Sequence, residues 1–222
     1  MAELISFQDG GYAFLEGVFP YSQGVKALPG YAIERLRFAR PLPIAEGFRA
    51  IEAQLAALGR PRTALCAAEL RSPKPFSFGG FGAFNEGYVD VLKSWQLYRA
   101  DRNPVARSNV APEIEPPAEP CFYAFCYTVP ASAPQDSFVV AGSGEWPEGG
   151  RFPEAIVARG DVSAVGLRAK ARWVCDRVCS QSRPCSMPPS SPVLRWRRRA
   201  LRRAFWSGVR PCLERSQARI AW

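Results

Sequence analysis

Two amphipathic stripes of helical period, each set between short apolar segments, constrain the fold more than any other feature. The first stripe has spacings of four, three and four: Ile44, Phe48, Ile51 and Leu55. The second has the same kind of spacing: Phe84, Tyr88, Val91, Leu92 and Trp95. Gly59 follows the first stripe and is a stop signal for a helix. Because a helix buries its apolar stripe against another element, the neighbouring segments are expected to form a sheet.

The neighbouring segments have the aromatic and β-branched character of strands. The predicted elements are a hairpin over 4–18 around Gly10-Gly11, a loop over 20–26, and strands over 31–38, 63–70, 103–112 and 121–129. In chain order this gives strand, strand, helix, strand, helix, strand, strand. The order predicts an α+β unit over residues 1–130, with two helices packed on one face of the sheet.

The pattern begins again after a linker over 130–135. Strands are expected at 137–144 and 155–158, followed by a helix over 161–178 with Asp161 as its N-cap. Residues 131–178 therefore predict the first half of a second repeat. Residues 179–222 are expected to be a separate tail rich in Arg, Pro and Ser, which is either disordered or the product of an out-of-frame reading.

The absence of histidine excludes serine–histidine and cysteine–histidine nucleophile pairs and imidazole metal sites. Seven cysteines, an odd number without regular spacing, indicate reduced thiols and a cytoplasmic protein. Four of them fit no zinc pattern: Cys175, Cys179, Cys185 and Cys212. No segment approaches the roughly 18 apolar residues of a membrane span. We therefore expect no metal, no cofactor and no membrane span.

The formal charge of +9 is concentrated in the tail. Residues 1–176 carry 18 basic and 19 acidic side chains, whereas residues 177–222 carry 11 arginines and one glutamate. A nearly neutral body suits a protein that binds small molecules. Binding of nucleic acid or of an anionic membrane remains an alternative only for the basic and aromatic segment 194–206.

Arg107 is the candidate anchor for a substrate. It lies in a strand-like run between prolines, NPVARSNVAP, over residues 103–112. A guanidinium group can grip a carboxylate with two parallel hydrogen bonds, which a lysine cannot do. The alternative is that Arg107 forms a surface or interface ion pair.

Three segments resemble the reactive-intermediate deaminases, also called the Rid or YjgF family. They are residues 20–25 (PYSQGV), the pattern Phe84-Asn85-x-x-Tyr88, and Ala106-Arg107-Ser108 with Val110, in the order and spacing of that family. The resemblance implies a chorismate-mutase-like α+β fold and a trimer. It also implies hydrolysis of imines and enamines to keto acids and ammonia in clefts between subunits. A second, weaker copy begins at residues 140–145, VAGSGE, which resemble the family's strand ending in Ser-Gly-Gln.

The resemblance implies a role for each matching residue. Arg107 would bind the substrate carboxylate, and Asn109 would stand beside the substrate nitrogen, where many relatives have a cysteine. The other expected substrate-binding residues of the first unit are Tyr21, Asn85, Tyr88 and Ser108. Structural alternatives are a packed loop aromatic for Tyr21 and a backbone hydrogen bond for Asn85.

Two departures from the family change the expected site. Active relatives carry a carboxylate on the final strand, whereas residues 121–129 include no acidic side chain. The hydroxyl expected after the second strand is replaced by FARP at 38–41. We therefore predict a composite site in which Arg107 faces Ser143 or Glu145 from the second repeat, with Glu145 in a catalytic role.

The predicted function is hydrolysis of a small carboxylate-bearing imine or enamine to a keto acid and ammonia, by a protein that self-associates. The alternative is a non-catalytic protein of the same fold that binds small carboxylates and has lost the acid–base group.

Overall fold

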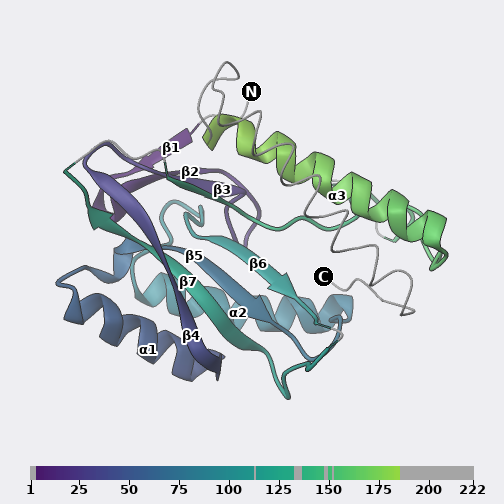
Figure 1. The fold of residues 1–222 in the computed structure, drawn as a ribbon, viewed down its shortest axis with the longest axis horizontal. Helices are drawn as coiled ribbons and strands as arrows, with labels where there is room; N and C mark the ends of the chain where they lie inside the picture. Colours follow the sequence, from purple (N-terminus) through teal and green to yellow (C-terminus); the bar gives the residue numbers. More distant parts are fainter. Residues whose placement is uncertain (1–3, 113, 133–136, 148–149, 152, 186–222) are drawn as a thin grey trace.

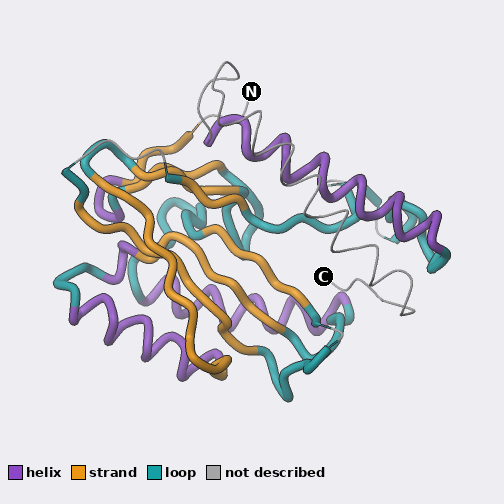
Figure 2. Tube along the Cα trace, viewed as in Figure 1, coloured by secondary structure: helices purple, strands orange, loops and turns teal. Residues whose placement is uncertain are grey.

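The computed structural model describes residues 4–112, 114–132, 137–147, 150–151 and 153–185. Two four-stranded sheets and three α-helices make up this part of the chain. Figure 1 shows two of the helices beneath the larger sheet and the third alongside the smaller sheet, and Figure 2 shows the same layers by element type. The predicted α+β class is confirmed, whereas the chorismate-mutase-like type stays a prediction.

The smaller sheet has the order β1-β2-β3-β8. Its strands are β1 (Leu4–Phe7), β2 (Tyr12–Leu15), β3 (Gly24–Ala27) and β8 (Phe138–Val140), all paired antiparallel. A short 3-10 turn, η1 (Gln8–Gly10), joins β1 to β2, so the predicted hairpin is confirmed. The predicted loop over 20–26 is wrong at its end, because β3 hydrogen-bonds to β2 on one side and to the distant β8 on the other.

The larger sheet has the order β4-β7-β5-β6. Its strands are β4 (Tyr31–Pro43), β5 (Leu65–Arg71), β6 (Ala106–Val110) and β7 (Cys121–Pro130). Strand β7 pairs antiparallel with β4 and β5, and β6 is the edge strand, parallel to β5. The four predicted strands are therefore present, with β5 preceded by the turn η2 (Arg62–Ala64).

Helices α1 (Ile44–Ala57) and α2 (Phe78–Ser94) cover one face of the larger sheet. The ring of Phe122 on β7 lies 5.0 Å from that of Phe48 on α1 and 6.5 Å from that of Tyr88 on α2. Gly47 permits this approach of α1, since a Cβ atom there would collide with the Phe122 ring. Gly59 follows α1 with φ of 63°, as the predicted stop signal requires.

Helix α3 (Ala164–Cys185) and strand β8 attach to the smaller sheet. Leu167 and Ala171 are buried on α3. The predicted strand at 155–158 is wrong, since these residues form turns. The predicted cap is also wrong. Ser163 caps α3, since its Oγ accepts from Gly166 N at 3.2 Å, whereas Asp161 lies two residues earlier and accepts from Ser163 N.

The C-terminal segment does not form a sheet of its own in the described chain. Strand β8 is the fourth strand of a sheet built by residues 4–27, and α3 continues to Cys185, past the expected boundary at 178. The second repeat stays a prediction. The tail beyond residue 185, including the basic segment 194–206, lies outside the described residues.

Candidate functional site

A polar layer is buried between the edge strand β6 and helix α2. The residues of α2 that face β6 follow the spacing i, i+3, i+4, i+7: Phe81, Phe84, Asn85 and Tyr88. Three of these side chains are aromatic, and Asn85 is the polar member of the stripe. The stripe therefore encloses Arg107, whose exposed fraction is 3%.

Arg107 is held by one hydrogen bond and surrounded by rings. Its Nη2 donates to Asn85 Oδ1 at 2.6 Å. The centre of the guanidinium group lies 4.8 Å from the ring of Tyr88 and 5.2 Å from that of Tyr21, with Phe81 and Phe84 each at 5.8 Å. These distances are those of cation–π contacts. The structure thus brings together the predicted residues Arg107, Asn85, Tyr88 and Tyr21.

No carboxylate compensates the charge of Arg107 within the described chain. None of the ion pairs found there includes Arg107, and its Nη1 is buried without a hydrogen-bond partner. The alternative of a surface ion pair is therefore wrong, because Arg107 is buried, whereas an ion pair at an interface stays a prediction. A buried cation is costly unless an anion or several acceptors compensate it, so this guanidinium is suited to bind an anionic ligand.

Burial changes the pKa values of Arg107 and Tyr88. Desolvation lowers the pKa of Arg107, although guanidinium groups stay charged in proteins. Burial raises the pKa of Tyr88 to about 12, against the opposing charge of Arg107. The Tyr88 hydroxyl is therefore protonated at neutral pH, and within the described chain it too has no hydrogen-bond partner. Both groups can donate to a ligand.

The loop that carries Tyr21 is anchored to the start of β6. Ser22 N donates to Val105 O at 2.9 Å, and Ser22 Oγ donates to Pro104 O at 3.1 Å. Val18 and Tyr21 exchange two backbone hydrogen bonds of 3.0 and 3.1 Å. Residues 20–22, at the start of the segment PYSQGV, are therefore a fixed turn that sets Tyr21 beside Arg107.

Asn109 shares the α2-facing side of β6 with Arg107. Successive residues of a strand point to opposite faces, so Arg107 and Asn109 lie on one face and Ser108 on the other. Asn109 pairs with Leu70 of β5, whose side chain is buried. Ser72 Oγ donates to Asn109 Oδ1 at 2.9 Å, and Asn109 Nδ2 is buried without a partner in the described structure.

Ser108 is directed toward the segment that follows β8. A Cβ atom on Gly142 would lie 3.6 Å from the Ser108 Cβ, and Gly142 N donates to Arg107 O at 3.2 Å. The segment therefore passes the edge of β6 beside Ser108, whose side chain lies on the face opposite to that of Arg107. Ser143 Oγ donates to the neighbouring Gly144 O at 3.4 Å.

Glu145 is engaged by helix α3. Its Oε1 lies 3.4 Å from Lys170 Nζ, and the two side chains are only 13% and 12% exposed. Its Oε2 is buried without a partner among the residues described. No hydrogen bond or ion pair in this part of the chain joins Glu145 to Arg107, so the predicted composite contact stays a prediction.

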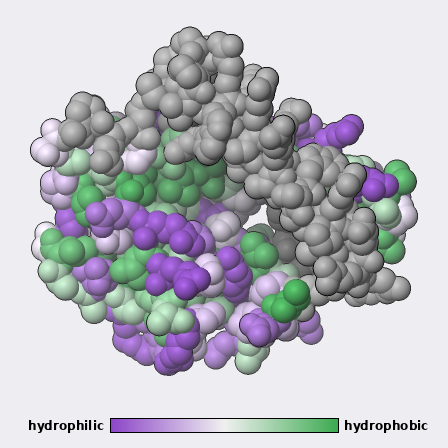
Figure 3. Space-filling view, viewed as in Figure 1, coloured by the Kyte–Doolittle hydropathy of each residue, from purple (hydrophilic) through white to green (hydrophobic). Residues whose placement is uncertain are grey.

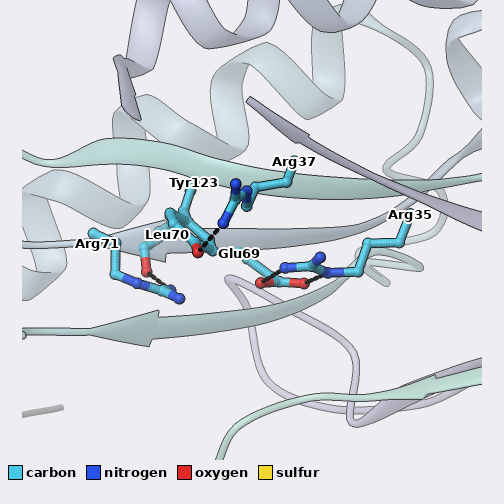
Figure 4. A network of polar contacts seen from close by, with 6 residues as sticks. All are labelled: Arg35, Arg37, Glu69, Leu70, Arg71 and Tyr123. Atoms are coloured by element: carbon cyan, nitrogen blue, oxygen red, sulfur yellow. Dashed lines mark hydrogen bonds and ion pairs between the residues drawn. The ribbon is translucent and has the colours of Figure 1, made fainter. Parts of the chain in front are cut away.

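The opposite face of the larger sheet is polar and open. Arg35 donates to both carboxylate oxygens of Glu69, at 2.5 and 2.8 Å, and Arg37 and Arg71 lie against the ring of Tyr123 at 5.9 and 4.2 Å (Figure 4). Hydrophilic side chains gather on the face of the sheet that is turned toward the viewer (Figure 3). Arginines on this side therefore differ from Arg107 in having partners and access to solvent.

Sequence reasoning missed three contributors to these polar groups. Phe81 could have been found by extending the second stripe one turn toward its N-terminus, where Ser77 caps α2 by accepting from Gly80 N. Ser72 and Lys170 carried no signal, because their partners Asn109 and Glu145 are 37 and 25 residues away along the chain. Within the described residues, no cluster of three or more His, Cys, Asp or Glu is placed to hold a metal ion.

No helix in the described part of the chain is long and apolar enough to cross a membrane. Comparisons with known proteins agree on one family. The profile described as 2-aminomuconate deaminase CnbZ matches residues 4–185. A 2-amino-5-chloromuconate deaminase of Comamonas testosteroni is 46% identical over 185 residues, which cover 82% of this chain and 73% of that protein. No solved structure matches significantly. The chain therefore belongs to the 2-aminomuconate deaminase CnbZ family.

Proposed function

We propose that this chain hydrolyses a small carboxylate-bearing enamine or imine of the 2-aminomuconate type, releasing ammonia and leaving a keto acid. The observation that carries the proposal is Arg107, a buried guanidinium with an unpartnered Nη1 and no carboxylate partner among the described residues. The substrate class is supported by the family and by the name of the relative.

The chemistry of such a substrate fits the layer around Arg107. An amino group on a carbon–carbon double bond beside a carboxylate forms a planar conjugated system. Arg107 would hold the carboxylate, and the rings of Tyr21, Phe84 and Tyr88 would flank the conjugated chain. Fixing the substrate in this way lowers the entropic cost of reaching the reactive geometry.

The reaction balances with one water. A carbon of the enamine gains a proton and its nitrogen loses one, which gives the imine. Water then adds to the C=N carbon, and ammonia departs as the new hydroxyl group loses its proton to become the carbonyl. Arg107 stays charged throughout, so a different group must carry protons.

Glu145 is the group proposed to carry these protons, since β7 has no acidic side chain. Its Oε2, unpartnered within the described chain, and its largely buried pairing with Lys170 support the role. Replacing Glu145 with Gln is expected to lower kcat for ammonia release with little change in KM. Unchanged hydrolysis in this variant would reject the role.

The test of the function compares two arginines. Ammonia release from 2-aminomuconate is measured for the wild type, Arg107→Lys and Arg35→Lys. Arg107→Lys is expected to lose about 100-fold in kcat/KM, because a lysine cannot make two parallel hydrogen bonds to a carboxylate. Arg35→Lys controls for the loss of an arginine on the open face and is expected to keep activity. Full activity of Arg107→Lys would overturn the proposal.

The second candidate is a carboxylate-binding protein without turnover. The lack of any acidic side chain on β7 favours it. This protein would show a thermal shift with 2-oxobutanoate that depends on Arg107, and no ammonia release in the assay above. The kinship to the Rid family and self-association also remain proposals, and sedimentation of the purified protein tests the latter.

A further inference from the structure

We propose that Asn109, fixed by Ser72, binds the second carboxylate of a dicarboxylate substrate whose first carboxylate is bound by Arg107. The inference rests on the proposed function and assigns Asn109 to the far end of the substrate, in place of the position beside the substrate nitrogen that the sequence resemblance implies. Ser72 is a positioning residue in this arrangement, because it acts through Asn109.

The hydroxyl of Ser72 determines which end of the Asn109 amide is free. Ser72 is 2% exposed, and its backbone N donates to Val110 O at 2.9 Å, so the residue is held against β6. Its Oγ donates to Asn109 Oδ1 at 2.9 Å. The acceptor end of the amide is therefore occupied, and the Nδ2 end, with two N–H donors, is presented to a ligand.

The unpartnered hydrogen-bond donors on this side of β6 could bind an anionic group near Arg107 and another near Asn109. Arg107 Nη1, Tyr88 Oη and Asn109 Nδ2 are buried and unpartnered within the described chain. Each can donate a hydrogen bond at neutral pH. A buried donor without an acceptor is unfavourable, so a ligand with acceptors at both ends would satisfy several such donors at once.

The backbone spacing of the two residues is comparable with the length of a six-carbon dicarboxylate. The Cα atoms of residues i and i+2 of a strand lie about 6.7 Å apart, and their side chains leave the same face. The carboxyl groups at the ends of a conjugated six-carbon chain have a comparable separation. The first carboxylate would bind the Arg107 cation, whereas the second would bind the neutral Asn109 amide. The difference in charge would distinguish the two ends of the substrate.

Two stable compounds provide the test. Muconate and sorbate share the conjugated six-carbon chain, but sorbate has a carboxylate at one end only. Affinities are measured by calorimetry for the full chain. The wild type is expected to bind muconate about tenfold more tightly than sorbate, the effect of hydrogen bonds to one further charged group.

Variants at the two positions should remove that preference without removing sorbate binding. In Ser72→Ala and Asn109→Leu the ratio of the two affinities is expected to approach one. Ser72→Thr keeps the hydroxyl group and should restore the preference. Asn109→Asp places a carboxylate beside the second carboxylate, so it is expected to bind sorbate more tightly than muconate, and it tests the inference even if Ser72→Ala fails to fold.

Three results would overturn the inference. They are a wild type that binds muconate no more tightly than sorbate, equal losses for both compounds in Asn109→Leu, and a preference for muconate that survives in Asn109→Asp. Such results would leave the proposed function intact if ammonia release still requires Arg107. Full activity of Arg107→Lys would instead reject the proposed function.

Discussion

On the open face of the β4-β7-β5-β6 sheet, Arg35 donates two hydrogen bonds to Glu69, whereas on the face beneath α2 Arg107 has a single amide oxygen as its polar partner. The side chain of Arg35 is 47% exposed, and Arg107 as a residue is 3% exposed. The arginine that water could solvate has a carboxylate, and the arginine that water cannot reach has none in the described chain.

This difference indicates that the two faces of the sheet have different roles. An exposed ion pair contributes about 0–1 kcal/mol to stability. A buried charge without a counterion costs several kcal/mol and survives only where another gain offsets it. Binding of an anionic ligand is such a gain, since the ligand supplies the missing charge. The α2 face is therefore the face that we propose for binding, and the open face contributes modestly to stability.

The contrast between the two arginines is removed most directly by giving Arg107 a carboxylate partner of its own. Asn85→Asp places one beside Nη2, where the Asn85 amide oxygen now accepts at 2.6 Å. The new ion pair would compete with the substrate, so kcat/KM for ammonia release is expected to fall at least about 100-fold, as loss of a buried charge-assisted contact implies. The melting temperature should rise, because the buried cation is then compensated.

Asn85→Ala is the matched control for that change. It removes the hydrogen bond to Arg107 without adding a charge, and activity should fall by less than about tenfold, the effect of one hydrogen bond to a charged group. If Asn85→Asp kept wild-type activity, Arg107 would not be the anchor for the carboxylate.

Tyr88 offers a second measure of burial on the α2 face. Its folded-state pKa of about 12 exceeds the ordinary value of 10.0. Its contribution to the free energy of unfolding is therefore complete below pH 10 and is lost as pH rises from 10 to 12. Two pKa units correspond to about 2.7 kcal/mol. The free energy of unfolding of Tyr88→Phe, measured by denaturant titration, is expected to fall less over this range than that of the wild type.

Between pH 7 and 9 the two proteins should differ by a constant amount, which serves as the internal control. If the wild type and Tyr88→Phe lost stability in parallel from pH 10 to 12, Tyr88 would ionise as readily in the folded chain as in the unfolded chain. The idea of a water-excluded layer around Arg107 would then be wrong.

What the sequence could predict depended on how local each signal was. Helix α1 was predictable because Ile44, Phe48, Ile51 and Leu55 repeat within one element, and Arg107 because its neighbours carry a motif. Strand β3 was missed because it is completed by β8, more than 100 residues away. Asn85 and Tyr88 were predicted, but the orientation of Asn109 depends on Ser72, which belongs to no motif.

The smallest expected effect belongs to the open face. Glu69→Gln removes the carboxylate of the Arg35 pair and leaves an amide of the same shape. Arg35 is half-exposed, so water can take over its hydrogen bonds, and the free energy of unfolding is expected to fall by less than about 1 kcal/mol. Ammonia release should be unchanged, because Glu69 and Arg107 occupy adjacent strands but opposite faces. A large loss of activity in Glu69→Gln would mean that the open face also contacts the substrate, and the division of labour between the two faces would have to be abandoned.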